Sequence, residues 1–294
     1  MNRFINPFTD IGFKRIFGQE LSKPLLMDFL NSLLVGEREI VSLSFLDKEQ
    51  PAVYDEDRSL IYDIYCELVN GEKIIVEMQN KEQPYFKERS IYYISESISR
   101  QGEKGTAWHY DIKAVYLVAF LNFKQAGIGD CFRTDVALMD MRTHRLFSDK
   151  LRLIYLQLPY FTKEADDCES DFDRWIYVLR NMETFKRLPW MAQKSVFERL
   201  AEIADVSSMS KEDRLKYDEG LRKYRDTLSV MEGQRLKGLE EGLEKGRAKG
   251  RVEGRAEGEH AKALEIACQL KSLGMDVQTI AVTTGLTFDE IKEL

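Results

Sequence analysis

The stretch "YDIYCELVNGEKIIVEMQ", residues 62–79, constrains the fold more than any other part of the sequence. Two runs rich in β-branched and aromatic residues flank the triplet "VNG", which is a turn signal between antiparallel strands. Asp63 and Glu77 place carboxylates inside these runs, where strand-like sequence usually carries apolar side chains. The pattern therefore predicts a β-hairpin that carries two acids for a reason other than packing.

The turn decides which residues of this hairpin face each other. A three-residue loop with Gly71 in the left-handed conformation places Glu67 opposite Lys73 and Asp63 opposite Glu77. The remaining pairs then match apolar residues with apolar residues. A two-residue loop would send Asp63 and Glu77 to opposite faces of the sheet and separate Glu67 from its lysine. We therefore predict the three-residue loop.

The opposed acids predict a metal site. Directly opposed residues have Cβ atoms roughly 4.5–5.5 Å apart, and two carboxylates so close repel unless a proton or a cation lies between them. Gln79 points to the same face, and the backbone carbonyl of Met78 is a further oxygen. Oxygen-only ligands favour Mg²⁺ or Mn²⁺, so Asp63, Glu77 and Met78 are the predicted ligands. The alternative is a solvated hairpin face on which the acids are incidental.

Two segments outside the hairpin space their apolar side chains as helices do. In residues 10–33, Ser22 and Pro24 predict a capped restart of the helix with proline in its first turn. The second segment covers residues 86–101. Its predicted apolar face consists of Ile91, Ile94 and Ile98.

The strand-like runs all lie in the first part of the chain. They cover residues 39–47, 61–69, 72–79, 112–123, 133–141 and 151–161, and a polar turn at 142–149 separates the last two. The run at 112–123 is almost continuously apolar, as in a strand buried on both faces. Amphipathic helical patterns replace strands from about residue 164. We expect an α/β domain at 1–160 with a helical region at 161–230 behind it.

A glycine repeat dominates the tail, residues 231–294. The repeated residues are Gly238, Gly242, Gly246, Gly250, Gly254 and Gly258. Because positions i and i+4 are neighbours on a helix, the repeat builds one glycine ridge. Each glycine costs about 1 kcal/mol relative to alanine in a helix interior. We expect a partner helix to approach closely along the ridge, with a second copy of the chain as the nearest candidate; partial disorder is the alternative.

The tail carries two further patterns. Arg247, Arg251 and Arg255 form a column beside the glycines, which is typical of a solvated face but could also meet phosphates or an acidic partner. The last twenty residues or so predict a helix, a turn at Gly285 and a second helix, like half of a helix-turn-helix motif. A packing cap is the favoured interpretation of this hairpin, and DNA recognition is the alternative.

Composition excludes some classes of protein. Net charge is −7, from 43 Lys and Arg against 50 Asp and Glu, which argues against a protein that coats nucleic acid through its overall positive charge. The sequence contains no run of about 18 uncharged apolar residues, so we expect no membrane-spanning segment. The four cysteines are scattered without a C-x-x-C pair, as in reduced cytosolic proteins, and the three histidines are equally dispersed. We expect a cytoplasmic protein.

The motifs resemble a known family. Asp63, followed after the hairpin by Glu77-Met78-Gln79, resembles the catalytic core of the PD-(D/E)XK nuclease superfamily. The resemblance is closer to the bacterial Rpn family of recombination-promoting nucleases, which are also described as transposases. The segment "TDIGFKRIFG" (9–18) resembles that family's opening signature, and Arg89 with Tyr92-Tyr93 resembles its next helix. The glycine-ridged tail is similar too, so the resemblance covers nearly the whole chain.

The resemblance implies a fold and a site. The fold is α/β, a restriction-endonuclease-like core with a mixed central sheet flanked by helices, followed by an α-helical C-terminal region. By resemblance, Asp63 and Glu77 hold the metal, and Gln79 occupies the position that is lysine in most of the superfamily. Glutamine can orient water, but it carries no charge and is no base at neutral pH. Asp10 and Lys14 match helix-one positions of the family.

The roles of the surrounding polar residues stay open. Asp10 either completes the site or belongs to a capped helix start. Lys14 is expected to contact a phosphate. Arg89 is a weaker candidate for the same role, because a solvated helix arginine is the commoner case.

The resemblance implies a metal-dependent DNA endonuclease that promotes recombination. The oxygen ligands predict Mg²⁺ or Mn²⁺ as the metal, and the glycine ridge predicts a homodimer. The alternative is a catalytically weak or inactive nuclease-fold protein that binds DNA or protein through its C-terminal helices as a regulatory module. The intact acid pair favours the enzyme. The acidic net charge and Gln79 favour the binding module.

Overall fold

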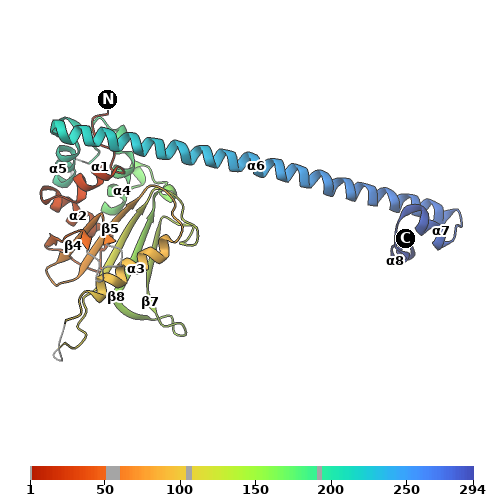
Figure 1. Ribbon diagram of the computed structural model, residues 1–294, viewed down its shortest axis with the longest axis horizontal. Coiled ribbons are helices and arrows are strands. Elements are labelled where there is room, and N and C mark those ends of the chain that lie inside the picture. The colour runs from red at the N-terminus through yellow and green to blue at the C-terminus, as the bar shows by residue number, and fades with distance from the viewer. Residues whose placement is uncertain (1, 51–59, 104–107, 191–193) are drawn as a thin grey trace. The chain divides into compact units, whose positions relative to one another are not determined.

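The computed structural model describes residues 2–50, 60–103, 108–190 and 194–294 (Figure 1). The chain forms two compact units, Met1–Leu228 and Ser229–Leu294. None of the helices in the described residues is long and apolar enough to cross a membrane.

A mixed six-stranded sheet forms the centre of the first unit, in the order β1-β4-β5-β6-β8-β7. Its strands are β1 (Leu43–Phe45), β4 (Ile64–Leu68), β5 (Lys73–Gln79), β6 (Val115–Leu121), β7 (Arg133–Met139) and β8 (Leu146–Gln157). The central strands β5, β6 and β8 are parallel, whereas β1, β4 and β7 join by antiparallel pairing. Two short strands, β2 (Glu49–Gln50) and β3 (Leu60–Ile61), pair apart from this sheet.

Helices cover both faces of the sheet (Figure 1). The helices of the first unit are α1 (Asp10–Phe17), α2 (Lys23–Leu33), α3 (Phe86–Ser99), α4 (Asp171–Asn181) and α5 (Ser195–Ala204). Short 3₁₀ turns connect the elements: η1 (Glu20–Ser22), η2 (Leu158–Tyr160), η3 (Ala165–Asp167), η4 (Met182–Thr184) and η5 (Val206–Ser208). One face packs into an aromatic core with α1, α2, α4 and α5, in which Phe120 contacts Phe13 and Phe29. On the other face, Ser90 and Ser97 of α3 share hydrogen bonds with Tyr155 and Tyr65.

The hairpin has the predicted register. Tyr65 pairs with Ile75 and Glu67 pairs with Lys73, and Gly71 adopts a left-handed φ of 82° in the turn. Only glycine adopts this conformation without strain, so the turn explains the glycine. The prediction that the strand at 112–123 is buried on both faces is also confirmed, because every residue of β6 is buried.

Three details of the predicted elements were wrong. Ser22 precedes α2, but its hydroxyl donates to the carbonyl of Gln19 instead of capping the helix. Ile91 is 51% exposed, because α3 turns its serines toward the tyrosines of the sheet. The polar turn between the last two strands is shorter than 142–149, since β8 already begins at Leu146 and pairs with β7 across a register shift.

Helix α6 (Lys211–Ser272) runs from the first unit into the second. In the first unit, Tyr217 accepts a hydrogen bond from the backbone N–H of Asn6 at 2.8 Å, and Tyr224 accepts one from Asn122 at 2.9 Å. These bonds tie the start of α6 to the core.

In the second unit, α6 ends against α7 (Val277–Thr284) and α8 (Phe288–Glu293). The predicted helix, turn and helix are confirmed, with Gly285 left-handed at a φ of 76°. Ala267, Ile280, Leu286 and Ile291 form a small buried cluster. The hairpin thus packs on the end of α6, as expected of a cap.

Candidate functional site

Asp63 and Glu77 meet where β4 begins and β5 nears its end. Glu77 lies within β5, and Asp63 directly precedes β4. The backbone N–H of Asp63 donates to Glu77 Oε1 at 3.3 Å, and the backbone N–H of Met78 donates to Asp63 Oδ2 at 2.8 Å. Each carboxylate therefore accepts a backbone hydrogen bond from the opposite strand. This reciprocal arrangement continues the ladder beyond its last backbone pair and holds the two acids together.

Burial makes it unfavourable for both acids to be charged. Glu77 is only 4% exposed. Its pKa is raised, first by burial and then by the nearby charge of Asp63. The pKa of Asp63 is also raised by burial, although the N–H of Met78 and the charge of Lys14 partly offset the effect. Buried Glu77 and half-buried Asp63, both with raised pKa values, call for a proton or a cation between them, so the pair fits a divalent cation.

The other oxygens at this position suit such an ion. Successive residues of β5 form backbone hydrogen bonds to alternate neighbouring strands. The N–H of Lys73 and the carbonyl of Gln79 both form theirs on the β6 side. Met78 lies between these alternate positions, so its backbone groups face the β4 side, where its N–H binds Asp63. In the described residues no group of three or more His, Cys, Asp or Glu side chains could hold a metal ion. A metal here would therefore need backbone, amide or water oxygens beside the two acids.

Gln79 belongs to a chain of side-chain hydrogen bonds. Its Nε2 donates to Glu77 Oε2 at 3.3 Å, and its Oε1 accepts from Gln83 Nε2 at 3.0 Å. Gln83 Oε1 in turn accepts a hydrogen bond from Arg89 of α3. Gln83 could not be predicted from periodicity, because it lies between a strand and a helix. Only its place between Gln79 and Arg89 could have suggested it.

Arg89 fixes the direction of both amides, because arginine can only donate hydrogen bonds. Gln83 must therefore turn its oxygen toward Arg89 and its nitrogen toward Gln79. Gln79 must then accept with its oxygen and turn its nitrogen toward Glu77. Ordinarily the orientation of an amide is ambiguous, but here the neighbours determine it. Gln79 thus offers hydrogen to the site rather than oxygen.

Arg89 is part of the site's surroundings and not a solvated helix residue. Its guanidinium lies 5.0 Å from the ring centroid of Phe86 and 5.6 Å from that of Tyr93. Its Nε is buried without a hydrogen-bond partner among the described residues. The charge of Arg89 lowers the pKa of both acids, against the larger effect of burial. Of the tyrosine pair, Tyr93 faces the site while Tyr92 is 53% exposed.

Helix α1 brings a second cation near the acids. Thr9 caps this helix by accepting a hydrogen bond from the N–H of Gly12 at 3.0 Å, so Asp10 is not the cap. Asp10 instead forms an ion pair with Lys14 at 2.5 Å. Lys14 lowers the pKa of Asp63 and Asp10 raises it. The structure places both residues within electrostatic reach of Asp63, without making Asp10 part of a three-acid cluster.

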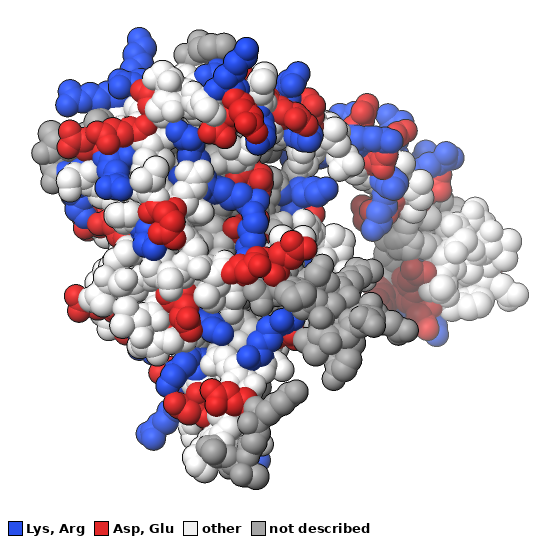
Figure 2. Space-filling view, turned by 60° about the vertical axis from the view of Figure 1, so that its left-hand side comes forward, with Lys and Arg blue, Asp and Glu red and all other residues white. Residues whose placement is uncertain are grey.

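The surface charges are mixed. Figure 2 shows Lys and Arg interspersed with Asp and Glu over the face in view, without a broad area of either sign. The net charge of −7 agrees with this pattern. A nucleic acid that contacted this face would therefore depend on local cations and not on a broad positive area.

The fold and the acid pair together define a nuclease-like protein of the PD-(D/E)XK type. The chain belongs to the PD-(D/E)XK nuclease family transposases, since the model of that family matches residues 7–234. The resemblance identified from the motifs is thereby confirmed for this range, and residues 235–294 lie outside it. No curated protein and no solved structure matches the chain. Nuclease-type chemistry is the function that membership indicates, and such nucleases generally use divalent metals.

Proposed function

We propose that this protein is a metal-dependent DNA endonuclease that hydrolyses phosphodiester bonds and promotes recombination. The observation that carries the proposal is the reciprocally bonded, buried pair of Asp63 and Glu77. A structural role alone would not require two acids whose pKa values are both raised. Family membership supplies the reaction class.

Asp63, Glu77 and the carbonyl of Met78 would hold Mg²⁺ or Mn²⁺. Such an ion, when bound, activates water and stabilises negative charge on a phosphate. Gln79 keeps its amide nitrogen on Glu77 and so helps to orient that carboxylate. It adds no positive charge where most of the superfamily has lysine. Lys14 and Arg89 are therefore the residues proposed to contact phosphate groups.

The proposed partner is DNA, and we propose the bacterial cytoplasm as the location. We also propose a homodimer that forms through the glycine-rich part of α6. Two copies would suit an enzyme that cuts two strands.

A plasmid-cleavage assay tests the proposal. Asp63→Asn and Glu77→Gln keep the shape of each side chain while removing its charge. Supercoiled plasmid in Mg²⁺ should be nicked by the parent and at least about a hundredfold more slowly by either variant. Glu67→Gln on the same hairpin is the matched control and should cleave like the parent. Equal cleavage by the parent and both site variants would exclude this site.

The second candidate is a catalytically weak nuclease fold that acts as a regulatory binding module. The neutral Gln79 and the exposed leucines of α6 favour it. Calorimetry separates the two functions, because the enzyme must take up Mg²⁺ or Mn²⁺ at Asp63 and Glu77. Absence of metal uptake by the parent would favour the module.

A further inference from the structure

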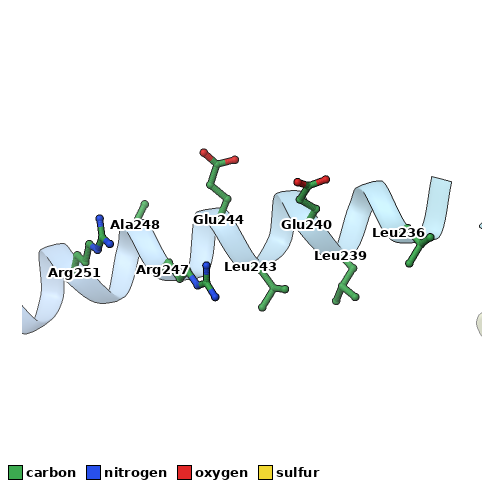
Figure 3. A pocket seen from close by; sticks show the side chains of 8 residues that line it. All are labelled: Leu236, Leu239, Glu240, Leu243, Glu244, Arg247, Ala248 and Arg251. Carbon is green, nitrogen blue, oxygen red and sulfur yellow. The ribbon is translucent and has the colours of Figure 1, made fainter. Parts of the chain in front are cut away.

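The glycine-rich part of α6 presents an apolar stripe to solvent. Leu236, Leu239 and Leu243 are 51%, 53% and 54% exposed and line a shallow groove along the helix (Figure 3). Gly246 and Gly250 continue the same stripe, because the five residues follow the alternating spacing of three and four that defines a coiled-coil seam. The seam thus carries bulky residues in its first half and glycines in its second.

Charge is segregated along the same direction. Glu240 directly follows Leu239 and lies beside the leucine half, and Arg247 directly follows Gly246 and lies beside the glycine half. Glu244 and Arg251 lie further round the helix (Figure 3). Ion pairs do form nearby on this helix, such as Lys249 with Glu253. Within the described part of the chain, however, none of these four charges forms an ion pair with another residue.

The isolated helix gains nothing from this arrangement. Glu240 and Glu244 are like charges four residues apart, as are Arg247 and Arg251, and such pairs weaken a helix slightly. A Cβ atom added to Gly246 or to any other glycine of the repeat would meet no atom of the described residues within 4 Å. No close contact with that part of the chain therefore explains these glycines. The exposed leucines, the glycines and the flanking charges together fit a helix from outside this chain.

We propose that this helix pairs with a second copy of itself in antiparallel orientation, about a two-fold axis between Glu244 and Lys245. Leu239 then lies opposite Gly250 of the partner subunit, and Leu243 lies opposite Gly246 of the partner subunit. Each leucine fills the space that a glycine leaves, which allows the two backbones to approach closely.

The same orientation satisfies the flanking charges. Glu240 faces Arg247 of the partner subunit across the seam, and the two-fold axis repeats this pair, whereas Glu244 and Arg251 lie further round the helix on the same side. A parallel, in-register pair would instead bring leucine to leucine and glycine to glycine, and it would separate Glu240 from Arg247 of the partner subunit. That alternative leaves gaps in the glycine half. Antiparallel self-pairing deepens the homodimer proposed above by naming its orientation and register.

The first measurement is the mass and the geometry of the full-length chain, without DNA or metal. Light scattering should give a dimer. A spin label at Lys262→Cys, in a Cys131→Ser, Cys268→Ser background, should report a distance of about 50 Å between copies, from 1.5 Å per residue on each side of the axis. A parallel pair would give less than about 20 Å. A monomer or the short distance would overturn the proposal.

Charge reversal is the second measurement. Glu240→Arg with Glu244→Arg should weaken dimerisation at least about tenfold, because arginine would then face arginine. Adding Arg247→Glu and Arg251→Glu should restore it, since the complementary pattern returns with opposite signs. Glu241→Arg with Glu265→Arg is the matched control, with the same charge change away from the flank, and should dimerise like the parent.

The proposal fails if the Glu240 and Glu244 double variant dimerises as well as the parent, or if the fourfold variant does not recover. Neither assay involves cleavage. A negative result here would leave the nuclease proposal standing, and an inactive nuclease would leave this pairing untouched.

Discussion

The acid-bearing hairpin buries charged side chains, whereas the glycine-rich part of α6 exposes apolar ones. Glu77 is 4% exposed and bonded to the opposite strand, whereas Leu239 is 53% exposed on a helix that the chain leaves uncovered. In the hairpin, the unfavourable free energy is electrostatic and comes from one pair of acids. In α6, the unfavourable free energy is conformational and comes from six glycines within a helix. Both regions are locally unfavourable, and the kind of cost indicates the kind of ligand: a cation for one and a helix for the other.

Replacing a leucine by alanine should have the most clearly different effects in the first unit and in the glycine-rich part of α6. Leu30 is fully buried, so Leu30→Ala should lower the free energy of unfolding of the first unit by about 2–5 kcal/mol. Leu239→Ala should leave that free energy unchanged and weaken dimerisation instead. Urea denaturation followed by tryptophan fluorescence measures the first effect, and light scattering measures the second. Equal destabilisation by both variants would contradict the contrast between the regions.

The pH dependence of stability should belong to the hairpin. The folded pKa of Glu77 is raised above its unfolded value, so its contribution to stability is present at low pH and lost as the pH rises. Metal-free protein should lose roughly 1.4 kcal/mol for each pH unit over which only the folded state keeps this proton. Thermal denaturation between about pH 5 and about pH 8 measures the loss.

Two comparisons control the pH experiment. Glu77→Gln should flatten the pH dependence, because the titrating group is gone, while Glu67→Gln should not. Addition of Mg²⁺ at the higher pH should restore stability to the parent only. A parent whose stability rises steadily over this range would show that the acids are not strained in the folded state.

Breaking the amide chain should have an intermediate effect. Gln83→Leu removes the group that holds Gln79 with its nitrogen toward Glu77. We expect plasmid cleavage to slow by about tenfold, which corresponds to about 1.4 kcal/mol, with little change in melting temperature. Glu82→Leu, the exposed neighbour, is the control and should cleave normally. Unchanged cleavage by Gln83→Leu would mean that the direction of the Gln79 amide does not matter.

Glycine replacement should have the smallest effect. Gly238 lies on the helix away from the seam, and a Cβ added there meets no described atom within 4 Å, so Gly238→Ala should stabilise the helix by up to about 1 kcal/mol without weakening the dimer. Gly250→Ala gains the same helix propensity but places a methyl group opposite Leu239 of the partner subunit. The dimer dissociation constants of the two variants should therefore differ. Identical constants would remove Gly250 from the interface.

The hairpin could be predicted because a small number of local rules agree there. The loop of three residues, the pairing of Glu67 with Lys73 and the glycine turn all demand one register, and the structure has it. The strand at 115–121 was equally clear, because every side chain in it is apolar and buried. In such segments the backbone geometry alone determines which side chains meet.

Other features depend on contacts that no local pattern contains. Ser90 and Ser97 are buried in place of Ile91 because tyrosine hydroxyls from distant strands accept or donate to them. Gln83 and Arg89 join the site through side-chain torsions, which spacing along the chain does not determine. Ser22 lost its expected capping role to a nearer carbonyl. Sequence reasoning could name the two acids and, through the family resemblance, Arg89, but not Gln83, which links Arg89 to Gln79.

Gly71 has a consequence that reaches beyond its own turn. Its left-handed φ of 82° closes a loop of three residues, six positions before Glu77 and eight after Asp63. Because side chains alternate faces along a strand, inserting or deleting one loop residue would rotate one acid to the far side of the sheet. The length of this turn thus decides whether the two carboxylates lie on the same face. One codon gained or lost in the turn would separate them although the gene would still encode every polar residue of the site.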